Sequence, residues 1–196
     1  MNYVIHSIIA FTFILIFSPV MVIIYFTILV VYQYNPIYVA KRVGLGQKTF
    51  SYYKFQTMYP INSAKIKGNT DQERITRLGL VLRKYSLDEL PSLLCVLLGN
   101  LSLVGPRPLP PVYNDLYSDR QRQRFLVKPG ITGLAQISGR NSISWSKRFA
   151  LDCFYVKKKS LCFDMIIGIK TVKKVIFAKD VHPTGASVVD NFNGKN

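Results

Sequence analysis

Two adjacent carboxylates, Asp88-Glu89, are the residues of this sequence best suited to chemistry. The chain has ten acidic residues, and these two are the only ones that are neighbours in sequence. An ionised carboxylate at a cationic site can act as a nucleophile, and a second carboxylate beside it can hold a metal ion. Arg83 lies five residues upstream and supplies a positive charge. Asp88 and Glu89 are therefore a candidate catalytic pair.

The start of a helix would explain the same residues without chemistry. Ser86 and Glu89 have the spacing of a capping box, in which each side chain satisfies a backbone donor of the first turn. Pro91 argues against Ser86 as the cap, because it would be the fifth helical residue and would leave a carbonyl unpaired. With Asp88 as the cap, Pro91 falls in the first turn, and the helix dipole and Arg83 both favour the ionised carboxylate. Catalytic pair and helix cap are both open at this point.

Arginines beside turns form a second group of candidates. Arg83, Arg107 and Arg140 lie next to a helix start or to glycine and proline turns, which suits fixed, bidentate contacts with phosphate. They could equally be solvated or paired with the scarce acids. With 26 basic residues against ten acidic ones, however, several must await an external anion. His6 lies in an apolar segment and His182 in the C-terminal tail, so histidine-based hydrolysis and histidine-rich metal sites are disfavoured.

The N-terminal segment that precedes these residues belongs in lipid. Residues 1–40 carry no charged side chain, and the run from Tyr3 to Val31 is 29 residues long, whereas about 20 apolar residues cross a bilayer as a helix. Ser18-Pro19 interrupts this run, and proline inside a helix costs ~3 kcal/mol or more. The segment either spans the membrane with a tolerated kink or breaks at Pro19 and returns to the face it entered. Length alone favours spanning, but the two halves on either side of Pro19 are each too short to span singly, so both courses remain open.

The charge of the remaining chain predicts its surroundings. All 36 formal charges follow residue 40, and the net charge is +16. Since the Lys/Arg excess begins at Lys41, the positive-inside tendency places this part in the cytoplasm. A hydrophobic content of 49% with a mean hydropathy of +0.18 indicates membrane association, with anionic lipids or phosphorylated substrates as partners. No RNP, KH or zinc-finger pattern supports nucleic acid as a partner. The cysteines, Cys95, Cys153 and Cys162, are expected to be buried thiols in a reducing compartment.

The roughly 155 residues after the apolar segment suit one compact domain. Hydrophobic alternation predicts strands over 38–43 and 49–55, joined by a Gly44-Leu45-Gly46 turn, and residues 59–70 read as a polar loop. Neither G-x-G-x-x-G nor a complete Walker pattern is present. Helical periodicity predicts helices over 71–84, 90–98, 115–125, 144–157 and 163–177.

The last of these helices is amphipathic. It carries Lys170, Lys173 and Lys174 beside Ile166, Ile169, Val172 and Ile176. Such a helix suits a bilayer surface. Packing of the apolar residues on the domain core, with a solvated lysine face, would explain the pattern equally well.

Several motifs in this chain resemble those of the bacterial sugar transferases, the monotopic phosphoglycosyl transferases. The first is Ser86-Leu87-Asp88-Glu89-Leu90-Pro91, and the others follow it in the order typical of that family. They are Ser102-Leu103-Val104-Gly105-Pro106-Arg107-Pro108, Pro129-Gly130-Ile131-Thr132-Gly133 and Gly139-Arg140-Asn141, with Ser18-Pro19, Tyr53-Lys54-Phe55, Asp152, Tyr155 and Phe192-Asn193-Gly194 extending the likeness over nearly the whole chain.

The resemblance implies a helix-rich α/β fold in two parts. Residues 1–35 would form a re-entrant membrane helix broken at Ser18-Pro19. Residues 36–196 would form a cytoplasmic domain with a small β-hairpin and interfacial amphipathic helices, resting on lipids of the bacterial inner membrane.

The resemblance also implies a two-step reaction. Asp88 would attack the sugar-bearing phosphate of a UDP-sugar, release UMP and carry the phosphosugar covalently until undecaprenyl phosphate accepts it. Glu89 would bind Mg²⁺. The cations expected around the diphosphate or uracil are Lys54, Arg83, Arg107, Lys128 and Arg140. The alternative is a non-catalytic membrane protein that binds lipid or a partner.

The chain departs from the family pattern at a few positions. Gln56 stands where Lys or Arg usually follows Tyr-Lys-Phe, and Asn100 replaces a common aspartate. Leu134 replaces a tryptophan. Lys128 replaces the arginine before Pro-Gly-Ile-Thr-Gly, an exchange that gives up bidentate geometry. The Asp88-Glu89 pair is intact.

Overall fold

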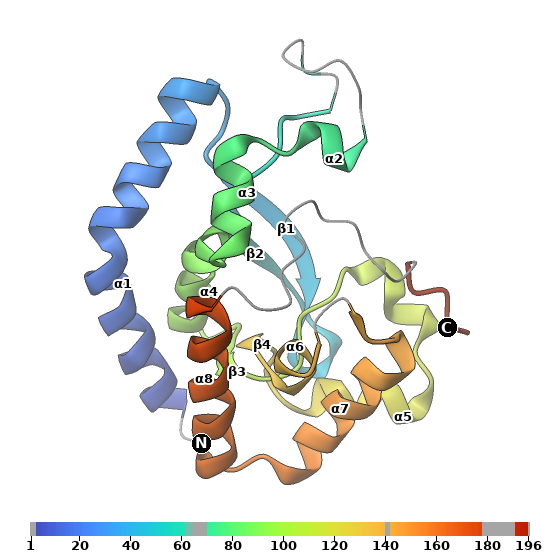
Figure 1. The fold of residues 1–196 in the computed structure, drawn as a ribbon. Helices are drawn as coiled ribbons and strands as arrows, with labels where there is room; N and C mark the ends of the chain where they lie inside the picture. Colours follow the sequence, from blue (N-terminus) through green and yellow to red (C-terminus); the bar gives the residue numbers. More distant parts are fainter. Residues whose placement is uncertain (1–2, 62, 64–69, 140–141, 178–190, 196) are drawn as a thin grey trace.

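A computed structural model describes residues 3–61, 63, 70–139, 142–177 and 191–195. Arg140, His182 and most of the 59–70 segment therefore lie outside the described residues. The fold is helix-rich with small sheets, as predicted (Figure 1). Its elements, in chain order, are α1 (Tyr3–Thr27), the π-helix η1 (Ile28–Tyr32), β1 (Ile37–Val43), η2 (Leu45–Gln47), β2 (Thr49–Phe55), α2 (Asp71–Arg74), α3 (Arg77–Lys84), η3 (Leu87–Ser92), α4 (Leu93–Leu97), β3 (Ser102–Val104), η4 (Pro111–Leu116), α5 (Asp119–Arg122), η5 (Gln123–Leu126), β4 (Gly130–Thr132), α6 (Leu134–Ile137), α7 (Trp145–Lys158) and α8 (Leu161–Ile176).

Helix α1 runs through Ser18-Pro19 without interruption, so the helix break predicted there is not observed. Pro19 has no N–H to donate to the carbonyl of Leu15 four residues back. The hydroxyl of Ser18 donates to that same carbonyl at 2.8 Å and replaces the missing bond. The axis of α1 nevertheless changes direction about halfway along, with its concave side toward the rest of the molecule (Figure 1). The Ser-Pro pair thus bends the helix and keeps its carbonyl satisfied.

Both ends of the apolar helix pack against the domain. Near its start, His6 is 1% exposed and contacts the hydroxyl of Ser102 at 3.2 Å and the backbone N–H of Leu103 at 3.3 Å. His6 therefore contacts protein and not lipid, contrary to its expected environment. Near the other end, Ile24 and Ile28 share a hydrophobic cluster with residues of β2 and α3. The helix lies along the domain over its whole length.

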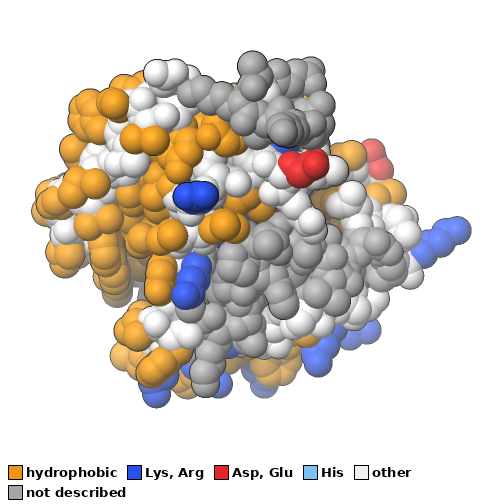
Figure 2. Space-filling model, turned by 45° about the horizontal axis from the view of Figure 1, so that its top comes forward, with side chains coloured by type: hydrophobic (Ala, Val, Ile, Leu, Met, Phe, Trp, Pro, Cys, Tyr) orange, Lys and Arg blue, Asp and Glu red, His pale blue; other side chains and the backbone are white. Residues whose placement is uncertain are grey.

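Most side chains of this helix are nonetheless exposed. The continuous segment Tyr3–Tyr32 is long and apolar enough to cross a membrane, and 18 consecutive residues within it reach a mean hydropathy of 2.8. Figure 2 shows hydrophobic side chains gathered on the side of the molecule where α1 lies. Such a large apolar surface indicates association with a membrane or with another protein.

Among the described residues, the strands form two small sheets of two strands each. β1 and β2 pair antiparallel with Ile37 opposite Phe55 and Val43 opposite Thr49, which confirms both predicted strands. Gly46 takes φ of 60° in the turn between them, a conformation that glycine adopts without steric cost. β3 and β4 add one short parallel pair.

Three predicted helices are shorter or interrupted. The helix expected over 71–84 is divided into α2 and α3 by Ile75, which is extended and forms a bridge with Met58. The helix expected over 90–98 reduces to α4, preceded by the 3₁₀ turn η3. The region 115–125 consists of η4, α5 and η5, whereas α7 and α8 confirm the two C-terminal helices.

The exposed face of α8 decides between the two interpretations of its pattern. Ile166, Ile169, Val172 and Ile176 are between 49% and 65% exposed, so the core-facing interpretation is wrong for them. Ile167, which is fully buried, is the residue that packs inward. An apolar helix face left open to solvent suits a bilayer surface.

Two of the three cysteine predictions hold. Cys95 and Cys153 are buried, but Cys162, in the first turn of α8, is exposed.

Candidate active site

The 3₁₀ turn η3 presents the Asp88-Glu89 pair, and neither capping interpretation is correct. Ser86 precedes the turn in a left-handed conformation, with φ of 55°, and its side chain makes no capping bond. Asp88 and Glu89 lie in the first turn of η3, and Pro91 lies inside it. Leu90 and Pro91 face the interior against β2, so the turn is held by packing. Asp88 is thus free of the structural task that a helix cap would give it.

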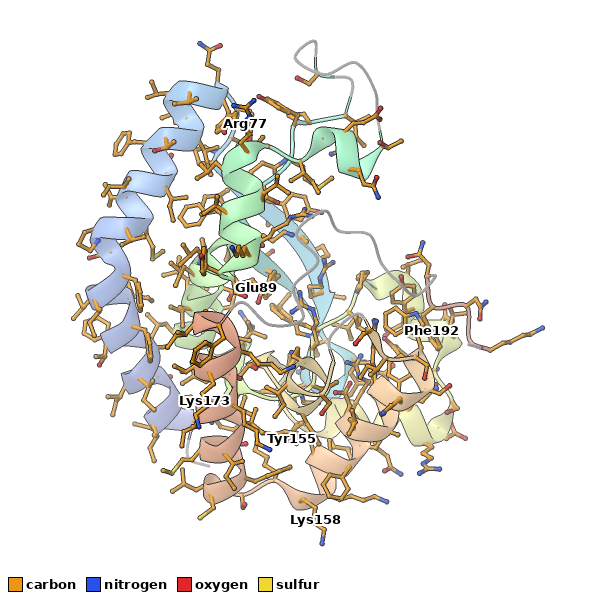
Figure 3. The ribbon with its side chains drawn as sticks, viewed as in Figure 1. Arg77, Glu89, Tyr155, Lys158, Lys173 and Phe192 are labelled. Carbon is orange, nitrogen blue, oxygen red and sulfur yellow. The ribbon has the colours of Figure 1, made fainter. Side chains whose placement is uncertain are left out.

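The two carboxylates differ in exposure and in partners. Asp88 is buried at 8% exposure. Glu89 accepts a hydrogen bond from Arg107 at 2.8 Å, and the two side chains are 19% and 50% exposed, respectively. Arg107 comes from the proline-rich loop that follows β3. Figure 3 shows Glu89 in the central part of the molecule, far from Lys158 at the end of α7.

Strand β2 supplies two further side chains to this site. Tyr52 and Lys54 are two residues apart and so point to the same face of the strand. Lys54 interacts electrostatically with both carboxylates, and burial lowers the pKa of its ammonium group while Asp88 and Glu89 raise it. Burial, followed by the charge of Glu89, raises the pKa of Tyr52, which keeps its hydroxyl protonated as a donor. Sequence reasoning found Lys54 but missed Tyr52.

Arg83 joins the site from the last turn of α3. Its Nε donates to the hydroxyl of Thr57 at 3.0 Å, which fixes the guanidinium group just after β2. Lys54, Arg83 and Arg107 are the cations that act on the Asp88 carboxyl. The structure therefore brings three of the five predicted cations together at the carboxylate pair.

The other two predicted cations are not part of this cluster. Arg140 lies outside the described residues. The side chain of Lys128 lies against the start of α1, with its Nζ 3.9 Å from the centroid of the Tyr3 ring. Lys128 was expected around the diphosphate or uracil. Its contacts in this structure are with α1 and the residues that follow α4, so it lies apart from the cations that act on Asp88.

Two arginines that the sequence analysis did not single out lie close to Arg107. Burial, followed by the charge of Arg107, lowers the pKa of both Arg42 and Arg148. Arg148 also stacks on Trp145, with its guanidinium carbon 4.4 Å from the ring centroid. The motif Gly-Pro-Arg-Pro drew attention to Arg107, whereas the proximity of Arg42 and Arg148 arises from the fold. The positive field at the site is thus stronger than the sequence motifs indicate.

The ionisation of Asp88 reflects opposing influences. Burial and the adjacent Glu89 carboxylate raise its pKa to about 6, while Lys54, Arg83 and Arg107 lower it. Arg83 thus acts in the expected direction, and burial, which the sequence does not report, acts against it. With a pKa of about 6 the group is still roughly nine-tenths ionised at pH 7. A buried carboxylate that retains its charge at neutral pH has the properties of a nucleophile.

A buried ion pair supports the loop that carries Arg107. Arg124, in η5, donates to Asp152 of α7 at 2.9 Å, and both side chains are about 3–4% exposed. Another bond from the same guanidinium reaches the backbone carbonyl of Arg107 at 2.6 Å. Arg124 thus connects the core to the backbone of a residue that contacts Glu89.

The carboxylate pair suits a magnesium ion shared with a substrate. Among the described residues no group of three or more His, Cys, Asp or Glu side chains forms a ready metal cage. Mg²⁺ is commonly held by one or two carboxylates together with substrate phosphates. The repulsion between Asp88 and Glu89, which raises the pKa of Asp88, is what a divalent cation beside them would relieve.

A buried carboxylate with three cations beside it, in a domain that carries a long apolar helix, is the arrangement of a membrane-associated enzyme for phosphorylated substrates. Residues 1–178 match the bacterial sugar transferase family. The chain is 47% identical to EpsL of Bacillus subtilis, an uncharacterized sugar transferase, over 88% of this chain and 87% of that protein. It belongs to the bacterial sugar transferase family and is an enzyme of that family.

Two further relatives have names that state their reactions. The chain is 40% identical to the undecaprenyl-phosphate galactose phosphotransferase of Salmonella typhimurium, over 71% of this chain and 33% of that protein. It is 37% identical to the UDP-glucose:undecaprenyl-phosphate glucose-1-phosphate transferase of Caulobacter vibrioides, over 69% of this chain and 54% of that protein. The chain thus spans about a third and about half of these two proteins.

Proposed function

We propose that this protein transfers a sugar 1-phosphate from a UDP-sugar to undecaprenyl phosphate, through a covalent intermediate on Asp88, and thereby initiates assembly of a surface glycan. The observation that carries the proposal is the Asp88 carboxyl, which is buried beside Glu89 and acted on by Lys54, Arg83 and Arg107. The names of the Salmonella and Caulobacter relatives support a UDP-sugar as the donor and undecaprenyl phosphate as the acceptor.

The reaction consists of two displacements at phosphorus. An oxygen of Asp88 attacks the phosphorus that bears the sugar, the bond to the UMP oxygen breaks, and UMP leaves with the electron pair. An oxygen of undecaprenyl phosphate then attacks the same phosphorus and expels the Asp88 carboxylate, which gives the diphosphate-linked sugar lipid. Phosphoryl transfer depends mainly on positioning and on neutralising spread charge. The cations around Asp88 would serve that purpose.

Glu89 is the residue that would hold Mg²⁺ in this proposal, and the bound metal would neutralise charge on the substrate diphosphate. Arg107, hydrogen-bonded to Glu89, would orient that carboxylate and contact the same diphosphate. Tyr52 would donate a hydrogen bond within the site, since its hydroxyl stays protonated.

The pH dependence of the first displacement follows from the raised pKa of Asp88. The nucleophile must be ionised, so activity is lost as pH falls through the pKa of Asp88, which is about 6 without a metal ion and which bound Mg²⁺ would lower. We expect kcat/KM for UMP release to fall roughly tenfold per pH unit below that value and to level off above it. In Glu89→Gln, loss of the neighbouring negative charge should lower the pKa of Asp88 and so move the pH profile of the remaining activity to lower pH. An unchanged midpoint in that variant would contradict the effect of Glu89 on the pKa of Asp88.

We further propose that α1 is re-entrant and that residues 36–196 lie on the cytoplasmic face of the bacterial inner membrane. A straight helix of 30 residues would be about 45 Å long, yet both ends of this segment pack on the same domain. If the helix spanned the bilayer, its two ends would lie on opposite faces. Part of the charged domain that packs on both ends would then have to cross the bilayer. The bend at Ser18-Pro19 and the open apolar face of α8 support a shallow placement in one leaflet.

Protease protection tests this placement. Cleavable tags added at both ends of the chain should be resistant in spheroplasts treated from outside and cut in inverted membrane vesicles, because both ends would face the cytoplasm. The C-terminal tag serves as the orientation control for each preparation. An N-terminal tag cut from outside, with the C-terminal tag protected, would show that α1 spans the membrane.

Release of UMP tests the proposed reaction itself. Purified protein in detergent, supplied with Mg²⁺ and undecaprenyl phosphate, should release UMP from at least one member of a panel of UDP-sugars. The same mixture without undecaprenyl phosphate should stop after about one turnover, because the covalent intermediate has no acceptor. Absence of release with every donor of the panel would contradict the proposed reaction.

A further inference from the structure

A groove of about 500 Å³ lies between the first turns of α1 and the end of α4. Its walls are mainly apolar. The residues that matter here are Val4, Ile8 and Phe11 from α1, Val96 and Leu97 from α4, and Lys128. Val4 and Ile8 are 58% and 60% exposed, so the groove opens directly to the surroundings of the apolar helix.

Two lysines contact the ring of Tyr3 at one end of this groove, and one of them, Lys128, also lines it. The Nζ of Lys128 lies 3.9 Å from the centroid of the Tyr3 ring, and the Nζ of Lys159 lies 5.3 Å from the same centroid. The ring attracts both ammonium groups but neutralises neither. Two like charges on one aromatic ring favour the approach of an anion.

Asp164, the carboxylate that interacts electrostatically with Lys159, is already engaged. Lys159 lowers the pKa of Asp164, but burial raises it more, and Asp164 accepts a hydrogen bond from Tyr155 at 2.7 Å. Within the described part of the chain, no ion pair joins Lys128 or Lys159 to a carboxylate. The positive charge at the groove therefore lacks a neutralising partner among these residues.

We propose that this groove binds one anionic phospholipid, with the phosphate at Lys128 and Lys159 and an acyl chain along the apolar walls. The pairing of a cationic end with an apolar channel matches the two parts of such a lipid. Neither lysine is among the cations that act on Asp88, so the bound lipid is a resident phospholipid and not the acceptor. The proposal rests on the membrane placement of α1 given above, but not on the transfer reaction.

Lipid retention provides the test. Full-length protein is reconstituted with equal amounts of phosphatidylglycerol and phosphatidylcholine and extracted in mild detergent. Native mass spectrometry then measures the mass of the protein with its retained lipids. We expect about one retained phosphatidylglycerol per chain, several-fold enriched over phosphatidylcholine. The variant Lys128→Gln/Lys159→Gln should lose that enrichment.

A matched variant separates a site from general attraction. Lys173→Gln/Lys174→Gln removes the same charge from α8 and should retain phosphatidylglycerol like the unmodified protein. Equal loss in both double variants would overturn the proposal, because attraction would then depend on net charge alone. Leu97→Trp keeps both lysines but fills the groove, and it should also reduce retention. Undiminished retention in Leu97→Trp would contradict the acyl-chain part of the proposal.

The source of the lipid phosphate is distinguished by competition. Undecaprenyl phosphate added before extraction should leave the retained phosphatidylglycerol in place. Its displacement would overturn the proposal, because the groove would then belong to the acceptor. Retention needs no sugar nucleotide, so a protein that fails to release UMP but retains phosphatidylglycerol would contradict the proposed function alone.

Discussion

Asp88→Asn is expected to reduce UMP release by at least about a thousandfold, since the variant removes the attacking oxygen but preserves the shape of the side chain. The carboxamide carries no negative charge and cannot form the acyl phosphate. Asp88 makes no capping bond that would tie it to the stability of η3, and the variant loses the repulsion from Glu89. We therefore expect its membrane attachment and thermal unfolding to match those of the unmodified protein. The measurement is initial UMP release with a saturating UDP-sugar.

Asp115→Asn provides the matched control. Asp115 is an exposed carboxylate in η4, so the same isosteric change there should leave UMP release unaltered. Incubation with a UDP-sugar labelled in the sugar, without acceptor, should leave label on the unmodified protein and on Asp115→Asn after acid quenching. Turnover by Asp88→Asn would exclude Asp88 as the nucleophile. An unlabelled but active native protein would instead indicate direct transfer to the acceptor.

The sequence predicted the parts of the site that local signals encode. The adjacency of Asp88 and Glu89 and the Gly-Pro-Arg-Pro turn at Arg107 are visible in the residues themselves. The alternation of β2 likewise placed Lys54 on a strand. The apolar helix followed from the absence of charge in residues 1–40. The strand and the apolar helix are confirmed, because each depends on residues close together in the chain.

Features that local signals do not encode depend on contacts between distant segments. Ile75 interrupts a helical pattern because it pairs with Met58, a tertiary contact that outweighs helix propensity. The pKa of Asp88 rises because the fold buries it, a term that no local motif reports. The side chain of Lys128 lies against Tyr3, a contact between distant segments that its motif does not report. Charge type was readable in the sequence, whereas burial and proximity were not.

The break predicted at Ser18-Pro19 shows a related limit. The rule that proline disrupts a helix assumes that its unpaired carbonyl finds no other donor. Here the preceding serine supplies that donor, so the helix bends and continues. Of the two residues that predict a break, Pro19 removes a backbone hydrogen bond and Ser18 replaces it.

The variant Asp152→Asn is expected to cost about 3–5 kcal/mol of unfolding free energy, because it leaves the Arg124 charge buried without its counter-ion. Both side chains are 3–4% exposed, so water cannot replace the lost partner. Thermal unfolding in detergent measures the loss, with Asp115→Asn as the exposed control. A change below about 1 kcal/mol would contradict the role of the pair in stability.

A second variant separates stability from the positioning of Arg107. Replacing both partners, in Arg124→Met/Asp152→Leu, removes the unpaired charge and should recover most of the lost stability, since apolar residues of similar volume can replace a buried pair. Met cannot, however, donate to the carbonyl of Arg107, which Arg124 holds at 2.6 Å. We expect this variant to remain roughly 10- to 100-fold slower in UMP release, because small displacements of a positioning group are costly. A stable double variant with full activity would show that Arg124 acts on the fold alone, whereas low kcat with recovered stability would make it a positioning residue for the cation that contacts Glu89.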